Sequence, residues 1–174
     1  GAKSNQKYYL APNITSIDKN PFTEDMEFIR LDFNTVFLEK HELYSQISNN
    51  EEKSEKLLGI LSDNRGKSLI YAGTYSNIDS LTILFLDTYG PVKNELLEMF
   101  AEWLTKNYDV NWRLTKLITR EIGVHNGRLH RSLSQIQVRL FEEEKGIKNL
   151  ISTSSIIEGV NTSAENVIIW RNRK

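Results

Sequence analysis

The feature that most limits the possible folds is an alternation of short apolar runs with longer stretches of helical periodicity, which begins at Lys67. Runs with the length and composition of buried strands occupy 67–73, 121–125, 148–153 and 166–170. Helical stretches lie between them. Because parallel neighbours are joined by crossovers, this alternation predicts an α/β fold with a mostly parallel sheet and helices on both faces. The continuous apolar runs at 148–153 and 166–170 are typical of strands that are covered on both faces.

Two helices are expected around the first of these strands. The stretch 49–64 carries acidic residues where its first turn would lie, which suits the helix dipole. The stretch 74–86 begins with Ser76 and Asp79, whose spacing is that of a capping box ahead of an apolar run. We therefore expect helices at both places, with Ser76 at the start of the second.

Two further helices are expected later in the chain. The stretch 92–108 repeats apolar residues at helical spacing, and Pro91 suits the first turn of that helix. The stretch 131–144 opens with Ser132 and Gln135 in capping-box spacing. A short helix is also expected between the last two strands.

The first part of the chain differs in character. Residues 1–50 are expected to be an arm or interdomain linker, in which 28–39 alternates apolar and polar residues as a half-buried strand does. Residues 51–174 are expected to form one domain, which is an ordinary size.

Composition excludes several classes of protein. Apolar residues make up 39% and charged residues 26%, which is typical of a globular domain and not of a disordered tail. No apolar run approaches the roughly 20 residues that a membrane span needs, so we expect no membrane contact. No secretory signal is visible and cysteine is absent, which is compatible with the cytoplasmic location that we expect. The absence of cysteine excludes disulfides and thiolate metal sites. The net charge of -1 means that any binding of nucleic acid must come from a local patch.

Polar residues and glycines follow the first three expected strands. In an open parallel sheet, ligands bind beyond the carboxyl ends of the strands, so these residues are the candidates for a site. They are Gly73, Thr74 and Tyr75 after the first strand, His125, Asn126, Gly127 and Arg128 after the second, and Thr153, Ser154 and Ser155 after the third. Short hydroxyl and amide side chains and exposed backbone N–H groups suit phosphate oxygens.

The local charge is expected to favour the same edge. Between 111 and 131 the only acidic residue is Glu121. The basic residues of that stretch are Arg113, Lys116, Arg120, Arg128 and Arg131. Such an excess can hold a phosphodiester backbone, and it can equally be a solvated basic face.

A family pattern becomes visible in this part of the chain. The segment "VHNGRLHRSLSQIQVRLFEEEKGIKNLISTSSIIEGVNTSAENVII", residues 124–169, resembles the second RecA-like domain of superfamily 2 helicases of the DExH/DEAD type. The segment "KSLIYAGTYSNID" (67–79) is similar to the strand and turn that open that domain. The resemblance covers about 60–170, and "STSSIIEGVN" (152–161) with the upstream His and Gly is its specific part. It implies a RecA-like fold, of the P-loop NTPase type.

The resemblance also implies roles for individual residues. Thr153 would contact nucleic-acid phosphates, with Ser152 and Ser154 as its neighbours. Thr74 and Gly127 would line the strand-binding edge, with Arg128 or Arg131 beside them. From their place after strands, we add Tyr75 and His125 to the expected nucleic-acid-binding residues. Glu158, Gly159 and Asn161 would face a nucleotide bound between two domains. Many relatives have Asp at the position of Asn161. An amide can form a hydrogen bond with a ribose hydroxyl, but unlike Asp it carries no negative charge.

Several parts of such a motor are missing from the sequence. It contains neither a G-x-x-x-x-G-K-[ST] loop nor a DExH or DEAD box. By resemblance, these parts, with most of the ATP and Mg²⁺ contacts, belong to the first RecA-like domain of the same parent protein. The arginine-rich motif expected after 166–170 is absent too, and "RNRK" (171–174) has the wrong spacing to replace it. We therefore expect a fragment with no catalytic residue and no metal ligand, inactive alone, from an ATP-dependent helicase that binds single-stranded DNA or RNA.

Other interpretations remain open. The segment is alternatively a non-catalytic RecA-like module that binds nucleic acid or protein. Thr153 can be a polar end to a strand, Ser154 a helix cap and His125 a structural residue. Tyr75 can stack on a base or pack on the next helix, whereas Trp103 is expected in the core.

Overall fold

The computed structural model describes residues 18–21, 23–24, 39–64, 66–154 and 163–171. The chain divides into two compact units, Gly1–Leu43 and Tyr44–Lys174. In the first unit, the described residues include a turn in which the backbone N–H of Thr23 donates to the carbonyl of Asn20 at 2.9 Å. The strand expected at 28–39 lies almost wholly outside the described residues. The second unit begins seven residues before the boundary expected at 51.

The second unit is an α/β fold. It begins with a 3-10 turn, Tyr44–Gln46. The helices and strands then follow in this order: α1 (Asn50–Asp63), β1 (Ser68–Tyr71), α2 (Tyr75–Thr88), α3 (Glu95–Asn107), α4 (Arg113–Ile118), β2 (Ile122–His125), α5 (Arg131–Glu142), β3 (Asn149–Ser152) and β4 (Asn166–Ile169). The short helix expected between β3 and β4 falls on 155–162, outside the described residues.

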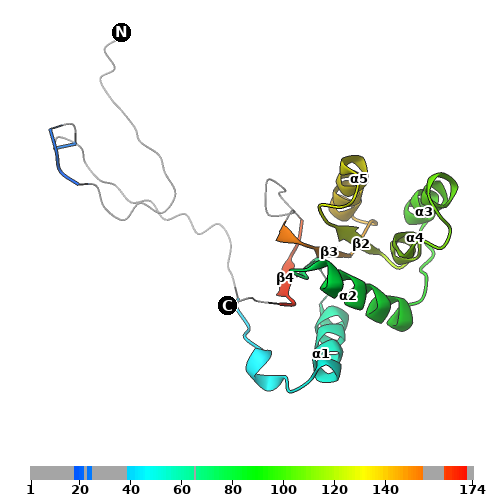
Figure 1. The fold of residues 1–174 in the computed structure, drawn as a ribbon, viewed down its shortest axis with the longest axis horizontal. Helices are drawn as coiled ribbons and strands as arrows, with labels where there is room; N and C mark the ends of the chain where they lie inside the picture. Colours follow the sequence, from blue (N-terminus) through cyan, green and yellow to red (C-terminus); the bar gives the residue numbers. More distant parts are fainter. Residues whose placement is uncertain (1–17, 22, 25–38, 65, 155–162, 172–174) are drawn as a thin grey trace, which may run out of the picture. The chain divides into compact units, whose positions relative to one another are not determined.

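The sheet is parallel throughout its described strands, which confirms the expected fold class and is consistent with a RecA-like domain. The strand order is β2-β3-β1-β4. In this register Ser152 of β3 lies opposite both Tyr71 of β1 and His125 of β2. Figure 1 shows α5 on one side of the strands and α1 and α2 on the other, and α4 contacts both β2 and α2. The carboxyl ends of β1, β2 and β3 therefore meet at one edge.

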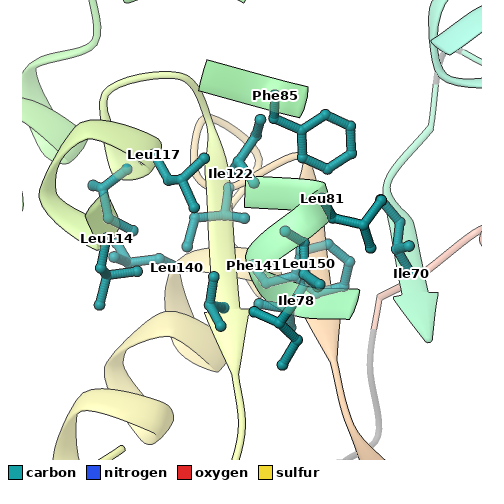
Figure 2. Close-up of a cluster of buried hydrophobic side chains, with 14 of the residues drawn as sticks. Ile70, Ile78, Leu81, Phe85, Leu114, Leu117, Ile122, Leu140, Phe141 and Leu150 are labelled. Atoms are coloured by element: carbon teal, nitrogen blue, oxygen red, sulfur yellow. The ribbon is translucent and has the colours of Figure 1, made fainter. Parts of the chain in front are cut away.

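The core fills the space between the helices and the sheet. Helix α2 contributes Ile78, Leu81 and Phe85, which Figure 2 shows among side chains from the strands. Large side chains that are fully buried elsewhere in the core include Ile70, Leu97, Leu104, Leu117, Ile118, Ile122, Leu133, Phe141, Ile147, Leu150 and Ile151. Burial of this apolar surface is the main force that holds the layers together.

The N-caps of α2 and α5 and the place of Pro91 differ from those expected. The N-cap of α2 is Thr74, not Ser76, because the preceding strand turns at Gly73, whose φ is 77°. The N-cap of α5 is His130, not Ser132, and its side chain accepts a hydrogen bond from the N–H of Ser132. Pro91 precedes the first turn of α3, because Asn94 caps that helix.

Two expectations about burial are wrong. Strand β4 is at the end of the described sheet, and Val167 remains 64% exposed, so this strand is not covered on both faces. Trp103 on α3 is 44% exposed, although Leu97 and Leu104 on the same helix are buried. Its ring instead stacks on Phe100, with the ring centres 6.3 Å apart.

Candidate nucleic-acid interface

The carboxyl edge of three adjacent strands forms the candidate site. We call it the rim and define it as residues 72–75, 125–131 and 152–154. Backbone hydrogen bonds connect its segments. The N–H of Ala72 donates to the carbonyl of Ser152 at 2.8 Å, and the N–H of Thr153 donates to the carbonyl of His125 at 3.2 Å. All nine residues proposed above for nucleic-acid binding lie on the rim.

Thr74 and Tyr75 lie where β1 passes into α2. The Thr74 hydroxyl oxygen accepts a hydrogen bond from the N–H of Asn77 at 3.3 Å. The side chain of Asn77 donates to the carbonyl of Ala72 at 2.6 Å. These two bonds fix the backbone on both sides of Tyr75, whose side chain is 37% exposed.

The loop after β2 carries Gly127 and Arg128. The side chain of Asn126 accepts hydrogen bonds from the N–H groups of Arg128 at 2.9 Å and Leu129 at 3.2 Å, which is an Asx turn. The Arg128 guanidinium lies 3.9 Å from the centre of the Tyr75 ring. A Cβ on Gly127 would lie 3.6 Å from the Tyr75 hydroxyl. The loops after β1 and β2 therefore meet at Tyr75.

The hydroxyl residues after β3 differ in their exposure. Ser154 is exposed, Thr153 is 8% exposed and Ser152 is fully buried. The Ser152 hydroxyl has no hydrogen-bond partner in the part of the chain that the structure describes. A buried hydroxyl without a partner is unfavourable by about 1–3 kcal/mol. Only Ser154 of these three presents its side chain freely at the surface of the rim.

His125 ends β2 and is half-buried. Burial lowers the pKa of the His125 imidazole, because the charged form loses its hydration. The neutral form is therefore favoured near neutral pH. In that state the ring contributes no positive charge to the rim.

The positive charge of the rim comes from two arginines. Arg128 and Arg131 follow β2 and are exposed. Arg120 precedes β2 and therefore belongs to the opposite edge of the sheet, where its side chain donates to the carbonyls of Tyr89 at 2.6 Å and Lys116 at 2.7 Å. Arg113 and Lys116 lie on α4, which also precedes β2. The expectation that all five basic residues share one edge is wrong, because the stretch that carries them runs from one edge of the sheet to the other.

The three residues expected at a nucleotide, Glu158, Gly159 and Asn161, lie outside the described residues. The sequence analysis predicts no structural role for Asn77 or Asn126, although both support the rim. For Asn126 the signal was available, since an Asn-Gly pair after a strand is a strong turn signal.

Two kinds of feature are absent from the described residues. They contain no group of three or more His, Asp or Glu side chains that could hold a metal ion. Among their helices, none is both long enough and apolar enough to cross a membrane.

Comparison with known proteins shows a similarity to a curated protein. No family model matches the chain. The chain is similar to Anti-bacteriophage protein B of Escherichia coli (strain K12), with 30% identity over 175 residues. The match covers 98% of this chain and 23% of that protein. The chain thus spans about a quarter of the length of this relative.

Proposed function

We propose that this chain is the second motor domain of an ATP-dependent nucleic-acid helicase or translocase, and that its rim grips the backbone of one strand. The observation that carries the proposal is the meeting of three strand ends at one edge. There the exposed Arg128 and Arg131 lie with the Ser154 hydroxyl and the backbone of the Gly127 loop. Cations and short polar groups aligned in this way suit a chain of phosphates.

The nucleotide chemistry is assigned to the rest of a parent protein. The sequence lacks a phosphate-binding loop, and the described residues contain no cluster that fits Mg²⁺. ATP would supply the energy for movement, and Glu158, Gly159 and Asn161 would face it. The contribution of the described residues is to bind and orient the strand, and we propose that the isolated chain neither hydrolyses ATP nor unwinds a duplex.

The biological setting is also a proposal. The relative is named for action against bacteriophage, so we propose that the parent protein acts on bacteriophage nucleic acid in the cytoplasm. A parent protein that lacks nucleic-acid-stimulated ATPase activity would instead favour the non-catalytic binding module.

The grip can be tested with the 174-residue chain. We expect it to bind a fluorescent single-stranded oligonucleotide, with an affinity that falls as salt rises. Arg131→Ala should make the slope of log affinity against log salt shallower by roughly 0.7, the value for one phosphate contact on a single strand. Fluorescence anisotropy at several salt concentrations measures that slope.

Lys116→Ala is the matched control, because it removes an exposed positive charge from α4, outside the rim. It should leave the slope unchanged. The proposal fails if the chain does not bind at low salt, or if the two substitutions change the slope equally.

A further inference from the structure

The stack of Arg128 on Tyr75 is a feature that a grip on phosphates does not require. Its two members come from the loops after β2 and β1, the strands that flank β3 in the sheet. Both side chains are exposed. An exposed cation–π contact contributes little to folding, so stability is a weak reason for this arrangement.

The pair is held in place before any ligand binds. On one side, the Thr74 cap and the bond from Asn77 to Ala72 fix the start of α2. On the other, the Asn126 side chain fixes the backbone of Arg128. A ring and a guanidinium that are ordered in advance lose less entropy on binding than mobile side chains do.

The pair is open to solvent over part of its surface, since Tyr75 is 37% exposed and Arg128 is exposed. Gly127 has no side chain to cover the Tyr75 hydroxyl, to which its Cβ position is 3.6 Å away. The pair also lies on the same rim as Arg131 and Ser154, where the phosphates of a bound strand are proposed to lie. A base attached to such a backbone would therefore reach the pair.

We propose that Tyr75 and Arg128 form a stacking shelf for an unpaired nucleobase, so that the rim selects single strands over duplexes. Tyrosine rings and guanidinium planes both stack on bases, and the contact tolerates any base because every base has a π-face. In a duplex the bases are already stacked on one another and cannot reach the shelf. Tyr75 provides the stacking surface, and Arg128, besides its proposed contact with a phosphate, positions the Tyr75 ring. The shelf depends on the proposed function, because the phosphates bring the base to it.

The test compares two oligonucleotides of equal length and charge, one of thymidines and one in which consecutive sites are abasic. The wild-type chain should bind the thymidine strand about tenfold more tightly, as the loss of one base stack predicts. Tyr75→Leu should bring that ratio close to one without changing the salt slope. Tyr75→Phe keeps the ring and should keep the ratio.

Arg128→Lys separates positioning from charge. It keeps the positive charge, so the salt slope should stay the same, but it loses the planar contact and should lower the thymidine-to-abasic ratio. Thermal unfolding of each variant checks that it is folded.

The outcomes distinguish the two proposals. Equal binding of both oligonucleotides by the wild type, with the salt slope intact, overturns the shelf and leaves the phosphate grip standing. A thymidine preference that survives Tyr75→Leu also overturns the shelf. Binding of neither oligonucleotide overturns the proposed function and the shelf with it.

Discussion

Gln137 is a buried amide whose side chain serves the backbone at two places. Its oxygen accepts a hydrogen bond from the N–H of Val124 at 2.8 Å, and its nitrogen donates to the carbonyl of Leu133 at 3.3 Å. Strand β2 ends the described sheet, so its outer backbone groups have no neighbouring strand. The side chain of Gln137 takes the place of a neighbouring strand at that position and covers the edge.

Replacing this amide should destabilise the fold. Gln137→Leu leaves the buried N–H of Val124 without its partner, and we expect the free energy of unfolding to fall by about 1–3 kcal/mol. Urea denaturation measures the change. Gln135→Leu makes the same substitution on the exposed face of α5 and should stay within about 0.5 kcal/mol of the wild type. Equal losses in the two variants would show that the bond to Val124 is unimportant.

At the scale of the element, the start of α2 depends on one hydroxyl. Thr74→Ala removes the N-cap bond to Asn77 and should lower the free energy of unfolding by about 1 kcal/mol. Thr74→Ser retains an acceptor oxygen and should recover most of the loss. Ser76→Ala is the comparison, since the sequence pattern favours Ser76 and the structure places it inside the exposed first turn. A larger loss for Ser76→Ala than for Thr74→Ala, again by urea denaturation, would restore the sequence-based assignment.

Sequence patterns predict the existence of most elements and place their ends within a few residues. Acidic residues in the first turn indicate α1, and capping-box spacing with apolar residues at helical spacing indicates α5, so the sequence predicts both helices within a residue or two of their bounds. Periodicity does not predict helix α4, because six residues are too few to show a period. The sequence also does not predict that β4 has an exposed face. Its continuous apolar run is the same for a central strand and for a strand at the end of the sheet.

At the scale of the whole molecule, the parallel sheet allowed the rim to be anticipated, because carboxyl ends of parallel strands meet at one edge. The contacts across the rim could not be anticipated in the same way. Nothing in the chain near Tyr75 indicates that Arg128, more than fifty residues later, stacks on its ring. The sequence likewise predicts an exposed side chain for Gln137, because it is a polar residue in an amphipathic helix. Its bond to Val124 follows only from the packing of α5 beside β2.

The stability of the whole unit should depend on pH through His125. Burial lowers the pKa of this imidazole below its ordinary value of 6.5, so the unfolded chain takes up a proton first as the pH falls. The free energy of unfolding should therefore decrease from about pH 7 to pH 5.5, above the range in which carboxylates titrate. His125→Gln should flatten that decrease, because it removes the imidazole whose pKa burial lowers. Urea denaturation at a series of pH values measures the slopes, and the same slope in His125→Gln as in the wild type would assign the dependence to other groups.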